Sequence, residues 1–101
     1  MSAREFFDTL EARADPERAE GLDNSYVFDV EGQGRWLVDL DNGKLKVTPD
    51  WTGGGDVVIS TSSETFDRLA AGKQSPTMAY MSGKLKIDGD LGAAMKLKKL
   101  F

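Results

Sequence analysis

The chain has 101 residues, of which 40% are hydrophobic and 30% charged, and it contains neither cysteine nor histidine. This composition predicts one domain with a thin core, and it excludes disulfides, thiolate chemistry and imidazole-based catalysis or metal binding. The formal net charge of −4 disfavours non-specific binding of nucleic acid, which needs a basic surface. The charge is unevenly placed, because residues 1–72 hold fifteen acidic and seven basic side chains, whereas residues 73–101 hold two acidic and six basic ones.

The first predicted element is an amphipathic helix over residues 3–14, because its apolar side chains recur at helical spacing: Phe6, Phe7, Leu10 and Ala14. A second, short helix is predicted over residues 15–21, with Asp15 as its N-cap, Pro16 in its first turn and Gly21 as its stop. Both helices precede the predicted sheet.

Three strands are predicted next, at residues 26–30, 36–40 and 44–47, because apolar and polar residues alternate along each of them. Asn42 and Gly43 favour a tight hairpin turn, so the three strands are expected to form an antiparallel meander. One face of this meander collects the apolar side chains Tyr26, Phe28, Val30, Trp36, Val38, Leu40, Leu45 and Val47. The other face is predicted to meet solvent, and it collects Asp29, Asp39, Lys44 and Lys46, with Val27 and Leu37 as exceptions.

Residues 49–55 contain three consecutive glycines and are predicted to be a flexible connector, because the spacing and the lysine of a phosphate-binding loop are absent. A fourth strand at residues 56–60 leads into a helix that Thr61 or Ser62 caps, with Thr61 and Glu64 at the spacing of a capping box. The buried stripe of this helix is predicted to be Phe66, Leu69 and Ala70.

Ser75 and Pro76 are predicted to begin another short helix, which Gly83 ends. Residues 84–88 alternate as a fifth strand, and Asp90 is expected to cap a last helix, whose apolar residues are Leu91, Ala94, Met95, Leu97, Leu100 and Phe101. The expected fold is one α+β domain over residues 1–101. In it, helices cover one face of a five-stranded, mostly antiparallel sheet in two layers.

No catalytic constellation stands out, so the expectation is a protein that is not an enzyme and that has no cofactor and no metal. Asp39 and Asp41 share one face of a strand and could in principle bind a metal. Their position across a hairpin from Lys44 and Lys46 favours a simpler interpretation as cross-strand charge partners. The many aromatic and methionine side chains fit either an ordinary core or an adaptable binding cavity, and their pattern leaves both open.

The second half of the chain resembles the sterol carrier protein domain, also called the non-specific lipid-transfer protein domain. The resemblance rests on Asp56, Val57, Phe66, Leu69, Gly72, Lys73, Pro76, Ala79 and Tyr80, and then on Gly83, Lys84, Leu85, Lys86, Ile87, Gly89, Gly92, Ala94, Met95, Lys96, Leu97 and Leu100. Phe28, Trp36 and the turn from Asp41 to Gly43 extend it toward the N-terminus.

The resemblance implies an apolar tunnel between the sheet and its helices. Members of the family bind sterols, fatty acids, acyl-coenzyme A and phospholipids without catalysis or a metal, so an apolar lipid is the expected ligand. A cavity of a few hundred Å³ is expected for an acyl chain. The residues expected to line it are Phe28, Trp36, Ile59, Phe66, Met78, Tyr80, Met81, Met95, Leu97 and Leu100.

Two further expectations concern partners. The basic end suggests that Lys96, Lys98 and Lys99 make transient contact with an anionic membrane surface. The alternative function is an accessory or homodimerisation domain with a filled core, which docks a partner protein or enzyme through Leu100 and Phe101. Residues 1–10 lack the apolar run of a signal peptide, and the chain ends in Lys-Leu-Phe rather than a peroxisomal address, so a cytoplasmic location is expected.

Overall fold

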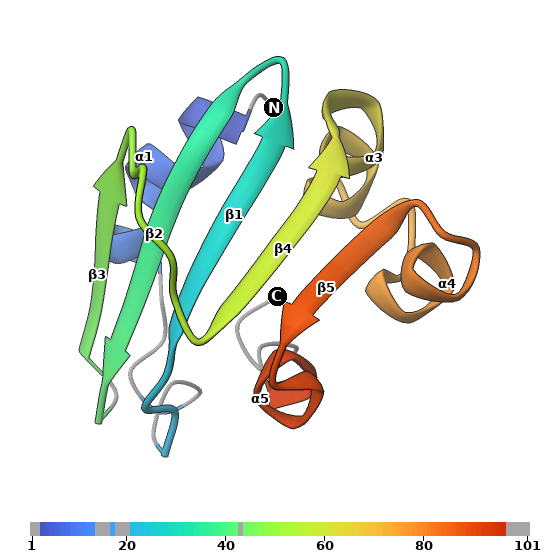
Figure 1. The fold of residues 1–101 in the computed structure, drawn as a ribbon. Coiled ribbons are helices and arrows are strands. Elements are labelled where there is room, and N and C mark those ends of the chain that lie inside the picture. The colour runs from blue at the N-terminus through green and yellow to red at the C-terminus, as the bar shows by residue number, and fades with distance from the viewer. Residues whose placement is uncertain (1–2, 14–16, 18–20, 43, 97–101) are drawn as a thin grey trace.

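The computed structural model describes residues 3–13, 17, 21–42 and 44–96, which form an open five-stranded sheet with its helices packed against one face (Figure 1). Along the chain, the first four elements are α1 (Ala3–Arg13), β1 (Ser25–Glu31), β2 (Gly34–Asp41) and β3 (Lys44–Pro49). The remaining five elements are β4 (Val57–Ser62), α3 (Ser63–Ala70), α4 (Pro76–Met81), β5 (Leu85–Gly89) and α5 (Leu91–Lys96). The predicted α+β fold class is therefore confirmed, whereas the helix predicted over residues 15–21 lies, apart from Glu17 and Gly21, outside the described residues.

The strands lie in the order β3-β2-β1-β4-β5, and every neighbouring pair is antiparallel except β1 and β4. The predicted meander is present, and Asn42 at its hairpin has a φ of 49°, in the left-handed region that a tight turn needs. Asp39 lies opposite Lys46, and Asp41 lies opposite Lys44. These carboxylates are thus placed as cross-strand charge partners, as the sequence indicated.

The inner face of the sheet carries the core. The predicted inward side chains of β1 and β2 are all buried, as are Val57 and Ile59 of β4. They pack against α1, which contributes Phe6, Phe7 and Leu10, and against smaller side chains of the later helices. The apolar faces of the helices and of the mixed sheet therefore meet in one core layer, as their sequence periodicities predict.

The outer face of the sheet differs from the prediction near its centre, where Val27 is fully buried. The connection between β3 and β4 leads from one edge of the sheet past β2 and β1, and Figure 1 shows it crossing in front of those strands, on the side away from α1. Along this path, the Trp51 backbone N–H donates to the carbonyl of Arg35 at 3.2 Å. Gly55 lies so close that a Cβ there would be 3.1 Å from Val27. The glycine-rich segment is a cover for the outer face rather than a free connector.

Helix caps set the boundaries of the last three helices. Ser62, not Thr61, caps α3, so the capping box predicted for Thr61 and Glu64 is wrong: Thr61 belongs to β4, and its hydroxyl donates to the carbonyl of Lys84 at 3.0 Å. Ser75 caps α4 as predicted. The Asp90 carboxylate caps α5 by accepting from the backbone N–H groups of Gly92 and Ala93, at 2.9 and 3.3 Å.

The turn from β5 into α5 requires glycine at position 89. Its φ is 111°, and a Cβ there would lie 2.3 Å from the carbonyl oxygen of Asp56. Only glycine allows this close approach between the end of β5 and the beginning of β4. The tight turn then directs α5 back toward the inner face, where Ala93 and Ala94 join the core.

Candidate functional site: an apolar cavity

A cavity of about 110 Å³ lies between the inner face of the sheet and the helices. The strands contribute Phe28, Ile59, Thr61, Leu85 and Ile87 to its wall, and the helices contribute Phe6, Phe66, Leu69, Ala70, Pro76, Thr77, Tyr80, Ala94 and Met95. Carbon atoms make up nearly all of this wall. The cavity is therefore suited to hydrocarbon, and water inside it would find few hydrogen-bond partners.

Aromatic rings close the cavity on the side of α1. Phe7 lies at the centre of this cluster, with ring centroids at 4.8 Å from Trp36, 5.1 Å from Phe28 and 5.5 Å from Phe66. Phe6 packs edge to face against Phe66 at 5.4 Å. These rings fill the space around Phe7, so the cavity meets α1 and β1 only at Phe6 and Phe28, and most of its wall comes from β4, β5 and the later helices.

Alanine side chains leave the cavity open on the opposite side. Ala79 of α4 and Ala93 and Ala94 of α5 are buried against the core, with exposed fractions of 0%, 3% and 8%. Such small side chains let a helix approach the sheet but fill little volume between them. Leu69 and Ala70 of α3 also line the cavity and are only partly buried.

A buried hydrogen bond fixes α5 to the sheet. The Tyr26 hydroxyl donates to the carbonyl oxygen of Ala93 at 2.7 Å, across 67 positions of sequence. Burial, and then the nearby carboxylates of Asp56 and Asp90, raise the pKa of Tyr26 above its ordinary value. The tyrosine therefore stays neutral and keeps its proton available for this bond.

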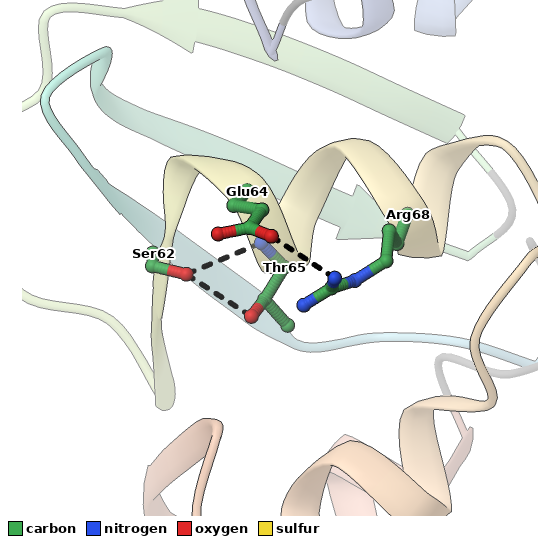
Figure 2. A network of polar contacts seen from close by, with 4 residues as sticks. All are labelled: Ser62, Glu64, Thr65 and Arg68. Carbon is green, nitrogen blue, oxygen red and sulfur yellow. Dashed lines mark hydrogen bonds and ion pairs between the residues drawn. The ribbon is translucent and has the colours of Figure 1, made fainter.

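Polar contacts at the N-terminus of α3 hold the helix that carries Phe66, Leu69 and Ala70. The Ser62 hydroxyl accepts from the Thr65 N–H at 3.2 Å and donates to the Thr65 hydroxyl at 3.0 Å, and Arg68 pairs with Glu64 one turn away at 3.1 Å (Figure 2). The side chain of Gln33 connects this helix to α1, because its amide donates to the Ser63 hydroxyl while its oxygen accepts from the Ala3 N–H. Both helices are thereby tied to the β1–β2 turn.

The structure brings five of the ten predicted lining residues to the cavity: Phe28, Ile59, Phe66, Tyr80 and Met95. Trp36 is not among the lining residues, because it stacks behind Phe7. Met78 and Met81 point away from the core, with exposed fractions of 62% and 75%. Leu97 and Leu100 lie outside the described residues, as do Lys98 and Lys99, whereas Lys96 is described and exposed.

Several lining residues were missed as site residues although their burial was indicated. Leu85 and Ile87 alternate along β5, and Leu69 and Ala70 belong to the apolar stripe of α3. Phe6 and Ala94 carry the same kind of helical signal. The pattern identified them as inward, but it held no information on where the core is filled and where it is hollow.

Comparison with known proteins assigns the chain to a family. A family model described as the SCP-2 sterol transfer family matches residues 6–101, and the chain belongs to that family. Hydroxysteroid dehydrogenase-like protein 2 of Xenopus tropicalis is 41% identical over 100 residues, which cover 96% of this chain and 24% of the frog protein. The chain thus spans about a quarter of the length of the curated relatives that match it over nearly its whole length.

Solved structures share the fold. The sterol carrier protein domain 2 of Helicoverpa armigera has a TM-score of 0.78 at 32% identity, over 95% of this chain and 82% of that one. The sec-alkylsulfatase Pisa1 from Pseudomonas sp. has a TM-score of 0.83 at 27% identity, over all of this chain but only 16% of the sulfatase. The fold therefore occurs both as a small domain and as part of a larger enzyme.

Two other kinds of site are not found in the part of the chain that the structure describes. No group of three acidic side chains is placed to hold a metal ion there. Within the same residues, no helix is both long and apolar enough to cross a membrane.

Proposed function

We propose that the chain binds the hydrocarbon part of apolar lipids in the cavity and transfers them, without a catalytic step. Membership of the SCP-2 sterol transfer family supports lipid binding in general. The observation that carries the proposal for this chain is the wall itself, in which Ile59, Phe66, Leu85 and their neighbours present carbon. Each methylene group moved from water into such a site contributes about 0.8 kcal/mol to binding.

The size of the cavity favours flexible acyl chains as ligands. Its volume of about 110 Å³ is smaller than the few hundred Å³ expected from the sequence, and smaller than the ~150 Å³ of an apolar cavity that holds benzene. A fatty acid, an acyl-coenzyme A or a phospholipid can insert one chain progressively as the walls separate. A rigid sterol nucleus needs the whole space at once, so we expect it to bind more weakly than an acyl chain.

The walls that separate are expected to be α4 and α5. Helix α4 has six residues, which is too short to be stable without tertiary contacts, and the described part of α5 is equally short. Each contacts the core mainly through alanine. Small shifts of these helices therefore cost less packing energy than shifts of α1 with its phenylalanines, and they would enlarge the cavity between Tyr80 and Met95.

A pair of neighbouring alanines provides the test. Ala70 lines the cavity, whereas Ala71 is exposed at the end of α3 and does not line it. Uptake of a fluorescent fatty acid by delipidated protein should be saturable. A70F should weaken it by at least tenfold because the ring occupies the cavity, and A71F should leave it unchanged. Absence of saturable uptake by the parent protein, or equal uptake by both variants, would contradict the proposal.

A second candidate function is an accessory domain that docks a partner enzyme. The observation in its favour is the short coverage of its relatives, because the matching segment is only 24% of the frog dehydrogenase-like protein and 16% of the sulfatase. Deletion of residues 99–101 distinguishes the two. Loss of self-association or partner binding with intact fatty-acid uptake supports docking, and loss of uptake alone supports a role of this end in lipid binding.

A further inference from the structure

Among the described residues, the large apolar side chains that remain exposed lie on two helices, α4 and α5. They are Met78, Tyr80, Met81, Leu91 and Met95. Both helices border the cavity, through Tyr80 and Met95. Figure 1 shows that these two helices adjoin β5 near its beginning and its end, remote from β3 at the opposite edge of the sheet. The exposed apolar side chains thus lie on two helices that flank β5 and border the cavity.

Helix α4 has three distinct sides that explain the exposure of its methionines. Ala79 is fully buried against the core, while Thr77 and Tyr80 line the cavity. Met78 and Met81 lie three residues apart, so they project together from the remaining side. Contact of such large apolar side chains with water is unfavourable, and exposed apolar patches often mark interaction sites. Methionine is flexible and adapts easily to an irregular apolar surface.

The charge around these helices indicates which kind of surface they bind. Residues 73–96 contain four lysines and two aspartates, whereas the preceding 72 residues contain fifteen acidic and seven basic side chains. Lys73 precedes α4 and Lys96 ends α5, and both are exposed. One of the two aspartates, Asp90, is already engaged as the cap of α5. The segment that carries α4 and α5 therefore has a net positive charge, and an anionic surface attracts it.

We propose that α4 and α5 dock on anionic lipid bilayers, with Met78 and Met81 immersed among the acyl chains and Lys73 and Lys96 at the headgroups. The biological role of this docking rests on the proposed lipid-binding function, because docking would place the cavity against the membrane that supplies its ligand. The contacts themselves require only the exposed apolar side chains and the charge. Such interfacial binding grows with buried apolar area and with attraction to anionic lipids.

Vesicle co-sedimentation tests the apolar contacts. The protein should bind vesicles of phosphatidylcholine and phosphatidylglycerol more tightly than vesicles of phosphatidylcholine alone. M78S/M81S should weaken binding to the anionic vesicles by roughly tenfold or more, because two partly immersed side chains lose their transfer free energy. M78L/M81L should restore it. Both variants should take up a fluorescent fatty acid from solution as well as the parent protein does, because neither methionine lines the cavity.

A charge-matched pair of variants tests the electrostatic contacts. K73Q/K96Q should weaken binding to anionic vesicles by about thirty-fold, which corresponds to two headgroup contacts of about 1 kcal/mol each. K44Q/K46Q removes the same charge from β3, at the opposite edge of the sheet, and should have a much smaller effect. Equal effects of the two pairs would show attraction by net charge alone and would overturn the proposed orientation.

The remaining outcomes separate this inference from the proposed function. Absence of vesicle binding by the parent protein, or unchanged binding by M78S/M81S, overturns the docking surface even if fatty acid is taken up. Vesicle binding without fatty-acid uptake overturns the proposed function and leaves the docking surface standing. Self-association that M78S/M81S abolishes, without any vesicle binding, would assign this surface to a second copy of the chain and would overturn the inference.

Discussion

The two halves of the core are built from the same sheet but packed in different ways. Next to strands β1 and β2, Phe7 of α1 contacts four other aromatic rings, which fill the space around it. Between α4, α5 and strands β4 and β5, alanines face the sheet and a cavity remains. The difference shows how a small fold combines a tightly packed part with an incompletely filled one: the aromatic half supplies packing energy, and the alanine half can remain incompletely filled.

Replacement of Phe7 by alanine should have the largest effect on stability. The ring is 1% exposed and contacts four other aromatic rings. F7A should lower the free energy of unfolding by about 3–5 kcal/mol, measured by urea denaturation. A loss below about 1 kcal/mol would mean that the aromatic half is not the stable part of the core.

Replacement of Leu69 by alanine should have a much smaller effect, although it also removes a large apolar side chain. Leu69 is only partly buried and already borders an empty space, so L69A should cost about 1–2 kcal/mol. Leu10, which is 3% exposed beside α1, provides the matched comparison, because L10A should cost about 2–5 kcal/mol. Equal losses in the two variants would remove the distinction between the halves.

Replacement of Tyr26 by phenylalanine should have the smallest effect at neutral pH and a characteristic effect at alkaline pH. Loss of its bond to Ala93 should cost about 1 kcal/mol and loosen α5. Because the pKa of Tyr26 is raised in the folded state, the unfolded chain loses this proton first, at about pH 10. The stabilisation is therefore complete below that pH and declines above it.

Urea denaturation of the parent protein and Y26F across this range measures that contribution. The stability difference between them should shrink as the pH rises above about 10. All other ionisable groups are common to the two proteins, so the comparison cancels their effect. A difference that stays constant or grows above that pH would contradict the account of Tyr26.

The architecture could be predicted from sequence because each element carries a local signal. Asn42 marked the hairpin, Ser75 and Asp90 marked helix starts, and alternation placed Val57 and Ile59 inward. The cover of the outer face could not be predicted, because Val27 is buried by a loop that is distant in sequence. The choice of Ser62 over Thr61 as a cap depended on where β4 ends, which its pairing with β1 and β5 determines.

The candidate site was only half predictable, for a physical reason. Apolar periodicity reports which side chains turn inward, and by that measure Trp36 and Ile59 are equivalent. Whether an inward side chain touches a cavity depends on the volume contributed from the facing helix, where Phe7 fills the space near Trp36 and Ala94 leaves it open near Ile59. Met78 and Met81 were misjudged because α4 turns these side chains away from the sheet.

Chemical-shift mapping of the methyl groups during titration with a fatty acid tests the central claim most directly. Shifts should concentrate at Ile59, Leu69, Leu85 and Ile87, which line the cavity. Val38 and Leu40, each 1% exposed in the aromatic half, should change little. Saturable shifts confined to the cavity side are the predicted result. Shifts centred on Val38 and Leu40, or no saturable shifts at all, would contradict the account that the incompletely filled half of the core receives the lipid.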